Sequence, residues 1–284
     1  MYNKYSAILI FLFASYSLAD SGELEIKVKN DNVLSLKGFN EKYGGWSKVE
    51  YKSPSTSFLI YDLPTKESSG VDVVASTDED MVSPDKKYIL IQRTSAGVVT
   101  DDKGKDIISE QTYCDMLSLA DGCLKNVGSA LQCDGSWAGG EWKPTSESGG
   151  SFEFSKSGMP PKKLISDVSR ISSSGARASA LSDLIFMGVP SYMACYPPQG
   201  NVAEYNDLGY FFSEGGENLI AMQIYERLLV LAPDRIPLKL NVADSFWALG
   251  KRDESVKYYV SYRDAMLKKG LGSKVPSRVE ERIK

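Results

Sequence analysis

The side chains available for chemistry in this chain are carboxylates, lysines, tyrosines, serines and cysteines, because the 284-residue sequence contains no histidine. That absence excludes serine and cysteine nucleophiles that depend on a histidine base, and it excludes zinc sites of the HExxH type. No Walker A, G-x-S-x-G or G-x-G-x-x-G sequence occurs either. Carboxylate catalysis is the enzymatic possibility that remains, and a retaining glycosidase would need two carboxylates about 5 Å apart.

Three aspartates around a glycine form a candidate cation site: Asp101, Asp102 and Asp106 surround Gly104. Their spacing lacks the ligand order of an EF-hand loop. A hairpin turn with Gly104 at positive φ accounts for the same residues. We therefore expect a turn here, and neither a metal nor a cofactor in this chain.

Tryptophans beside glycines are a second pattern with chemical potential, because an indole ring can stack on a sugar. We instead expect these rings to pack in a core or against a disulfide, which is a familiar arrangement in β-sandwiches. The residues concerned are Trp46, Trp137 and Trp142.

Four cysteines, an even number, predict disulfides if the protein is exported. They are Cys114, Cys123, Cys133 and Cys195. A Cys123–Cys133 bridge would close a hairpin about Gly128, and a Cys114–Cys123 bridge would close a short loop. Cys195 could instead join Cys114 or Cys133, so the pairing stays open. Zinc binding is disfavoured because there is no C-x-x-C pair.

Residues 1–19 have the features of an export signal. Lys4 precedes an apolar run over residues 7–18, and Ser17 and Ala19 supply small residues before a cleavage site at Asp20. Twelve helical residues span about 18 Å, which is less than a hydrocarbon core of about 30 Å. We expect a secretory signal peptide, a periplasmic location and no stable membrane insertion.

Charge is unevenly distributed along the chain. Residues 249–284 carry ten Lys or Arg and five Asp or Glu, whereas the whole chain has a formal net charge of −4. This basic end could meet an acidic partner, but a solvated terminal helix is the simpler interpretation. The acidic balance of the whole chain argues against a nucleic-acid partner.

The periodicity of the sequence predicts an α+β protein with two domains. Residues 20–160 form the antiparallel β-rich domain with the disulfides, because short runs of β-branched and aromatic residues alternate with turn clusters. Residues 161–284 form the helical domain, because apolar residues there recur at helical spacing. The predicted strands are 24–28, 33–36, 46–51, 57–61, 71–75, 88–93, 98–100 and 105–108, followed by a loop or hairpin within 134–161. The predicted helices after the cysteines are 203–213, 218–231, 237–249, 253–268 and 276–284.

A repeat with a period of 34 residues lies in the helical half. The matching pairs are Leu208/Val242, Gly209/Ala243, Phe212/Phe246, Gly216/Gly250, Ala221/Ser255 and Tyr225/Tyr259. These positions resemble the tetratricopeptide (TPR) pattern over residues 202–269, although Lys239 and Leu267 depart from it. The small residues would let paired helices approach closely, and the two glycines would end the first helices in left-handed caps. Residues 163–199 match poorly, and we expect a degenerate hairpin or cap there, with Gly175 and Ala178 at the shifted positions.

The resemblance implies a scaffold that binds peptides or proteins, because TPR first helices line a concave groove. The implied groove residues, with Tyr210 and Trp247 as aromatic anchors, are Asn206, Tyr210, Ser213, Leu240, Asp244 and Trp247. Trp247 could instead pack on the β-rich domain. The chaperone-tail clamp of the family needs Lys and Asn in the groove, so that activity is not implied here.

The sequence therefore predicts an exported, non-catalytic protein that engages a protein partner of unknown identity through a short TPR-like groove. One alternative is an immunity or inhibitor protein that neutralises a toxin or a cell-wall enzyme. Another is a carboxylate-based glycan hydrolase or sugar-binding protein. The oligomeric state stays open.

Overall fold

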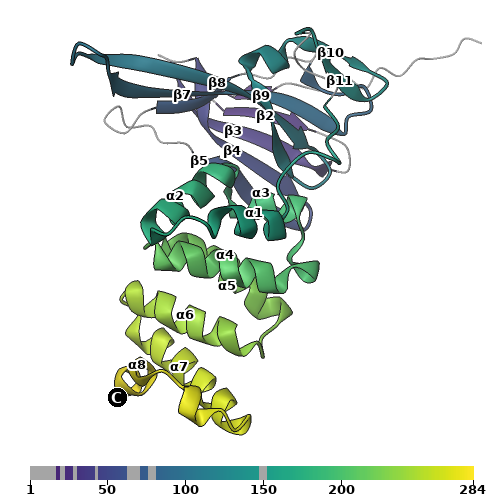
Figure 1. Ribbon diagram of the computed structural model, residues 1–284. Helices are drawn as coiled ribbons and strands as arrows, with labels where there is room; N and C mark the ends of the chain where they lie inside the picture. The colour runs from purple at the N-terminus through teal and green to yellow at the C-terminus, as the bar shows by residue number, and fades with distance from the viewer. Residues whose placement is uncertain are drawn as a thin grey trace, which may run out of the picture. The chain divides into compact units, whose positions relative to one another are not determined.

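The computed structural model describes residues 17–19, 23–27, 31–41, 44–62, 71–75, 81–146 and 152–284. The chain divides into two compact units, Met1–Phe154 and Ser155–Lys284. The described part of the first unit is built on antiparallel strands and the second unit is helical (Figure 1). The predicted α+β class is confirmed. The predicted signal peptide lies outside the described residues, apart from Ser17–Ala19.

Within the described residues, nine strands of the first unit form one antiparallel sheet. They are β1 (Ser17–Ala19), β2 (Glu23–Lys27), β3 (Val33–Asn40), β4 (Gly45–Ser53), β5 (Thr56–Asp62), β6 (Val71–Ala75), β7 (Tyr88–Thr100), β8 (Asp106–Ser118) and β9 (Leu124–Ser129). The order across the sheet is β1-β2-β3-β4-β6-β7-β8-β9, and β5 pairs with β4. Every predicted strand is present. In β2 the alternating residues bury one face, since Leu24 and Ile26 are buried.

The hairpin between β7 and β8 is longer than the sequence suggested. The two runs predicted at 88–93 and 98–100 belong to one 13-residue strand, β7. The turn is the predicted one, since Gly104 has a φ of 76° and the Asp101 carboxylate accepts hydrogen bonds of 2.9 Å from the amides of Lys103 and Lys105. Asp101 therefore stabilises a turn, as its position before Gly104 predicted.

One buried polar contact connects distant parts of the sheet. The Asn32 side-chain amide donates 3.0 Å hydrogen bonds to the hydroxyl of Tyr51 and to the carbonyl of Leu119. The second of these bonds joins residues 87 positions apart. Because a buried amide needs partners, this contact fixes the start of β3 against the end of β8.

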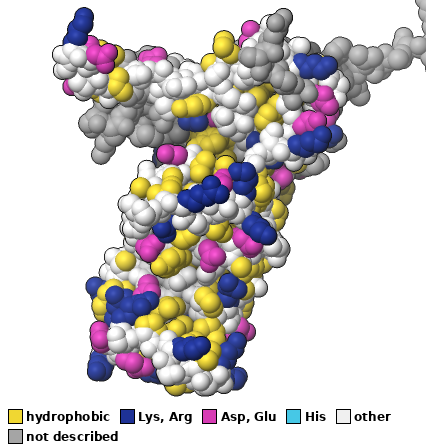
Figure 2. All heavy atoms as spheres, viewed as in Figure 1, with side chains coloured by type: hydrophobic (Ala, Val, Ile, Leu, Met, Phe, Trp, Pro, Cys, Tyr) yellow, Lys and Arg dark blue, Asp and Glu magenta, His cyan; other side chains and the backbone are white. Residues whose placement is uncertain are grey.

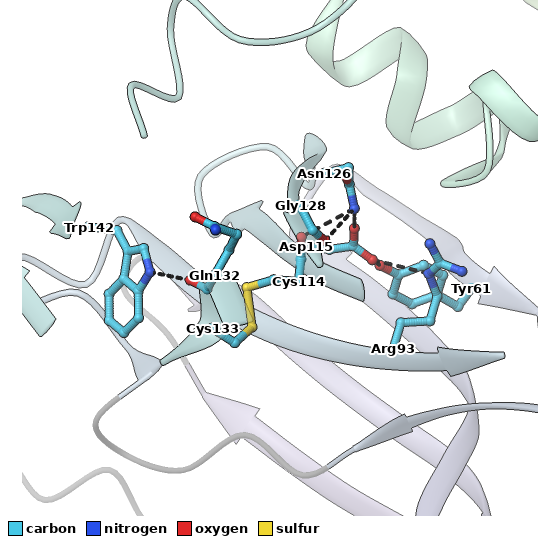
Figure 3. Close-up of a disulfide and its surroundings, with 9 residues drawn as sticks. All are labelled: Tyr61, Arg93, Cys114, Asp115, Asn126, Gly128, Gln132, Cys133 and Trp142. Atoms are coloured by element: carbon cyan, nitrogen blue, oxygen red, sulfur yellow. Dashed lines mark hydrogen bonds and ion pairs between the residues drawn. A yellow bond between two sulfur atoms is a disulfide. The ribbon is translucent and has the colours of Figure 1, made fainter. Parts of the chain in front are cut away.

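A second, two-stranded sheet covers a disulfide. Strands β10 (Gly135–Ala138) and β11 (Glu141–Pro144) form the hairpin expected within 134–161. Trp142 is buried with the bridged Cys114 and Cys133 (Figure 3). Trp137 packs against the same cluster. Trp46 is also buried. The prediction that these tryptophans pack in a core or against a disulfide is confirmed.

All four cysteines are disulfide-bonded, as predicted, and two disulfides are present. Cys114 bonds to Cys133, while Cys123 and Cys195 are also disulfide-bonded. The pairings Cys123–Cys133 and Cys114–Cys123 are therefore wrong, as is a bond from Cys195 to Cys114 or Cys133. The reason is that Gly128 lies within β9, opposite Cys114 of β8. The 3-10 helix Ala130–Cys133 then brings Cys133 back to β8.

The second unit is a stack of helices in chain order (Figure 1). They are α1 (Pro161–Val168), α2 (Ser174–Leu184), α3 (Gly188–Cys195), α4 (Val202–Glu214), α5 (Asn218–Leu231), α6 (Ile236–Ala248), α7 (Arg252–Lys268) and α8 (Ser277–Ile283). The five helices predicted from residue 203 onward are confirmed, with ends that differ by a residue or so.

The repeat glycines have the roles that their positions predicted. Gly209 is a close approach, since a Cβ there would lie 2.3 Å from Cε1 of Tyr225. Gly216 has a φ of 96° and ends α4 in a Schellman motif, in which the Glu217 amide bonds to the Phe212 carbonyl at 2.9 Å. Gly250, with a φ of 76°, ends α6 in the same way.

The segment 163–199 differs from the expected degenerate hairpin, because it contains three helices. Gly175 is not a close-packing residue, since nothing lies within 4 Å of a Cβ built there. Ala178 is buried and lies against Gly215. Pro190 lies in the first turn of α3, where a proline is tolerated.

Among the described residues, no single helix is both long enough and apolar enough to cross a membrane. The helices Ser174–Leu184 and Gly188–Cys195 reach that length and apolar character only when they are taken together, and the angle between them is 66°.

Candidate functional site

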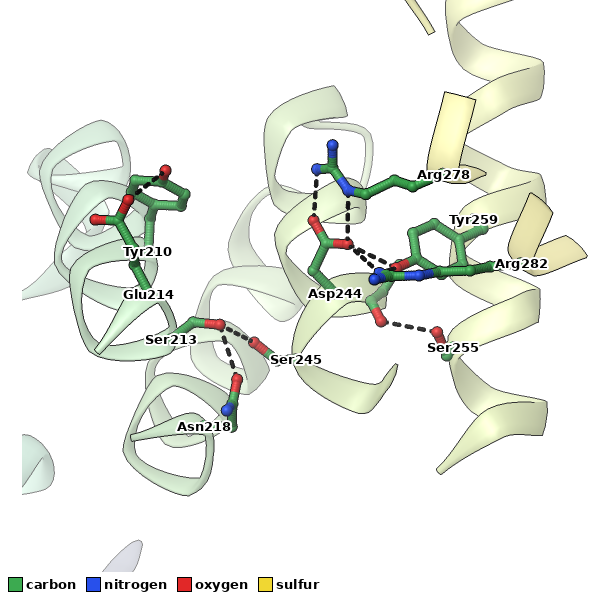
Figure 4. Close-up of polar contacts among 11 residues, drawn as sticks. Tyr210, Ser213, Glu214, Asn218, Asp244, Ser245, Ser255, Tyr259, Arg278 and Arg282 are labelled. Carbon is green, nitrogen blue, oxygen red and sulfur yellow. Dashed lines mark hydrogen bonds and ion pairs between the residues drawn. The ribbon is translucent and has the colours of Figure 1, made fainter. Parts of the chain in front are cut away.

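The six residues that the repeat pattern placed in a groove lie on two helices, α4 and α6. The structure separates them into residues that join the two helices and residues that remain partly exposed beside charged neighbours. Figure 4 shows Tyr210, Ser213 and Asp244 from these groups, together with Arg278 and Arg282 of α8.

Three of the six residues lie where helices meet. Asn206 is only 4% exposed, and its side-chain oxygen accepts a 3.3 Å hydrogen bond from Asn241 of α6. Ser213 shares a 3.0 Å hydrogen bond with the hydroxyl of Ser245. Leu240 packs against the apolar cluster of α6, α7 and α8. These side chains join helices, so they present less surface to a partner than the repeat pattern implied.

Tyr210 is the most exposed of the six, at 45%. Its hydroxyl donates a 3.2 Å hydrogen bond to Glu214, one turn later on α4. Glu214 in turn forms a 3.0 Å ion pair with Arg177 of α2. Partial burial and the Glu214 carboxylate raise the pKa of Tyr210, so its hydroxyl remains a hydrogen-bond donor at neutral pH.

Asp244 lies at the centre of a cluster of hydrogen bonds. Its carboxylate accepts from the Tyr259 hydroxyl at 2.6 Å, from Arg278 Nε and Nη2 at 3.2 and 2.8 Å, and from Arg282 Nη1 at 2.9 Å (Figure 4). Arg282 also contacts the Tyr259 hydroxyl. Bidentate pairing of this kind fixes both distance and orientation. Burial, followed by the hydrogen bond to Asp244, raises the pKa of Tyr259 to about 12.

Two guanidinium groups lie over the Trp247 ring. Arg252 lies 3.7 Å from the ring centroid and Arg282 lies 4.7 Å from it. Arg252 also donates a hydrogen bond to the Trp247 carbonyl at 2.6 Å. The indole is therefore a platform for cations, and one of its cations comes from α8.

These contacts define one surface, which we call the Tyr210–Asp244 face. Its members are Arg177, Tyr210, Glu214, Asp244, Trp247, Arg278 and Arg282. Its two parts lie on neighbouring helices, because Ser213 of α4 and Ser245 of α6 share a 3.0 Å hydrogen bond. Over the helices in view in Figure 2, charged side chains of both signs lie among hydrophobic ones.

The arginines of this face were not predicted as groove residues, although the 34-residue period points to one of them. Tyr210, Asp244 and Arg278 are separated by 34 residues each. Continuing the period by one more step would have placed Arg278 at the position equivalent to Asp244. Arg177 and Arg282 had no comparable signal.

The first unit holds a buried ionic network beside its disulfide. The fully buried Asp115 accepts hydrogen bonds from Tyr61 at 2.6 Å, from Arg93 at 3.1 Å and from Asn126 at 2.8 Å (Figure 3). Burial raises the pKa of Tyr61 well above its ordinary value. Because Tyr61, Arg93 and Asp115 are buried and bonded to one another, the network stabilises the sheet.

No cluster of three or more acidic or cysteine side chains capable of holding a metal occurs in the part of the chain that the structure describes. No family model matches the chain, and no curated protein matches it either.

Proposed function

We propose that this chain is an exported, non-catalytic protein that engages a protein partner through the Tyr210–Asp244 face. Two disulfides are compatible with an extracellular or periplasmic protein. The signal peptide over residues 1–19 and the periplasmic location are part of the proposal. So is the TPR-like character of residues 202–269, which is supported by helix pairs that repeat every 34 residues with glycine caps at Gly216 and Gly250.

One observation carries the binding role: three alternate helices, α4, α6 and α8, each contribute a polar side chain to one surface at the same repeat position. Those side chains are Tyr210 of α4, Asp244 of α6 and Arg278 of α8. Tyr210 remains 45% exposed and the Arg278 side chain 42% exposed. Tyrosine and arginine are the residues most often found to dominate binding energy at protein interfaces.

The test is capture of a partner from periplasmic extract by the full chain, wild type and Tyr210→Ala, with the captured proteins quantified by mass spectrometry. We expect Tyr210→Ala to weaken capture at least tenfold, since loss of a hot-spot aromatic residue costs about 2 kcal/mol. Leu219→Ala is the matched control, because Leu219 is 68% exposed on α5, outside this face. If Tyr210→Ala captures every wild-type partner as well as Leu219→Ala does, the proposal is wrong.

A further inference from the structure

Helices α4 and α6 contribute the acidic side chains of the Tyr210–Asp244 face, Glu214 and Asp244, whereas α2 contributes Arg177 and α6 also carries Lys239. Helix α4 carries Glu204, Asp207 and Glu214 and no Lys or Arg. Helix α6 contributes Asp244 to the face. The arginines that meet Asp244 come from α8, which begins after Pro276.

Helix α8 is short and depends on its contacts with the other helices. It has seven residues, Ser277–Ile283, and an isolated helix of this length is unstable in water. Val279 is its one buried side chain, and Ile283 packs partly against the same cluster. The remaining attachment is polar: Arg278 and Arg282 bind Asp244, and Arg282 also lies over Trp247.

The ionic part of this attachment is accessible to solvent. The Asp244 side chain is 27% exposed, and the Arg278 side chain is 42% exposed. Ion pairs at this degree of exposure contribute little net stability and weaken with salt. A second segment that offers the same groups can therefore compete with α8 for Asp244 and Trp247.

We infer that α8 occupies the place of the partner, and that the partner presents a basic segment of the same chemistry: two arginines one helical turn apart, each followed by an apolar residue. This inference rests on the proposed binding function and names the chemistry of its ligand. The charge complementarity is that of Arg278 and Arg282 with Asp244, and the apolar complementarity is that of Val279 and Ile283 with the cluster of α6 and α7. Binding then requires displacement of α8, so that the arginines of the partner take the places that Arg278 and Arg282 hold on the face in the unbound chain.

The test uses a fluorescent peptide with the sequence of residues 275–284, VPSRVEERIK, as the probe. It is titrated into the full-length wild type and into the double variant Arg278→Ala/Arg282→Ala, in which α8 is released from Asp244. We expect the double variant to bind the probe at least tenfold more tightly than the wild type, because its own α8 no longer competes. Adding Asp244→Asn to the double variant should abolish this gain, and a probe with both arginines replaced by glutamine should not bind.

Equal binding of the probe to wild type and double variant, or to neither, overturns the inference. So does a gain that survives Asp244→Asn. Tighter binding of the glutamine probe than of the arginine probe would indicate an acidic or apolar ligand, and it overturns the inference as well. The double variant needs a circular dichroism spectrum like that of the wild type.

If the double variant does not fold, hydrogen exchange on the wild type replaces it. We then expect the amides of residues 277–283 to exchange faster in about 1 M salt, where the Debye length is about 3 Å, while α5 is unchanged. Unchanged exchange in α8 overturns the inference. Loss of partner capture in Tyr210→Ala together with a failed probe experiment would leave the binding function intact and remove only the role given to α8.

Discussion

Arg278 donates hydrogen bonds of 3.2 and 2.8 Å to the carboxylate of Asp244, which precedes it by 34 residues. The interval equals the period of the helical repeat, so this ion pair links equivalent positions on α6 and α8. The chain therefore uses its repeat position once for an exposed aromatic side chain, Tyr210, and twice for an ionic contact.

Alkaline pH should weaken the fold at Tyr259. Burial and the hydrogen bond to Asp244 raise the pKa of Tyr259 to about 12, whereas a tyrosine in the unfolded chain has a pKa of about 10. Above about pH 10 the unfolded state loses this proton first, so the stabilisation is complete below that pH and disappears as the pH rises through 12. Urea unfolding from about pH 9 upward should show a shallower loss of stability in Tyr259→Phe than in the wild type. Identical slopes for the two proteins would contradict the assignment.

Gly209→Ala should destabilise the helical unit by about 1–3 kcal/mol, because its methyl group would lie 2.3 Å from the ring of Tyr225. Gly175→Ala is the matched control, since open space surrounds that position and alanine favours a helix. Denaturant unfolding followed by far-UV circular dichroism compares the two. Equal stability in both variants would mean that Tyr225 moves aside without cost.

Asp115→Ala should cost about 3–5 kcal/mol, because it removes the carboxylate that pairs with the buried Arg93. Asp102→Ala, in the exposed turn between β7 and β8, should change stability by less than about 0.5 kcal/mol. The readout is the urea midpoint of the β unit, followed by tryptophan fluorescence. A loss below about 1 kcal/mol in Asp115→Ala would show that the network contributes little to stability.

Removing the Cys114–Cys133 bridge by a double substitution to alanine should lower stability by about 3 kcal/mol. The bridge joins residues 19 positions apart, and closing a loop of about this size reduces the entropy of the unfolded chain by that amount. Thermal unfolding of the variant and the wild type without reductant measures the difference. Peptide mapping of the unreduced protein should recover a Cys114–Cys133 peptide, and recovery of Cys114 linked to Cys123 would refute this connectivity.

Local patterns predicted many elements of this fold, because each depends on residues close together in the chain, but they did not predict β9 or most of β8. Strand β2 follows from the alternation at Leu24 and Ile26, and the end of α4 follows from Gly216. The disulfide pairing could not be predicted, because it depends on the 3-10 helix Ala130–Cys133, which brings Cys133 back to β8. That helix has no periodicity of its own.

The candidate site was predictable only in part, for a related reason. The repeat located Tyr210 and Asp244 at equivalent positions, which lie on α4 and α6. It could not show that Asn206 would turn into the helix interface, since this depends on the amide of Asn241. Nor could it show that Arg282 would lie between Asp244 and Trp247, because that contact depends on how the chain turns between α7 and α8.

The hydrogen bond from Asn32 to Leu119 indicates that the two units fold at different rates. It needs 87 residues of chain to be in place before its two ends can meet, whereas Arg278 and Asp244 are separated by 34. Contacts between distant residues slow folding, because a longer loop must be closed before any contact rewards it. The helical unit should therefore regain its structure ahead of the sheet, and refolding should show a fast helical phase followed by a slower one in tryptophan fluorescence.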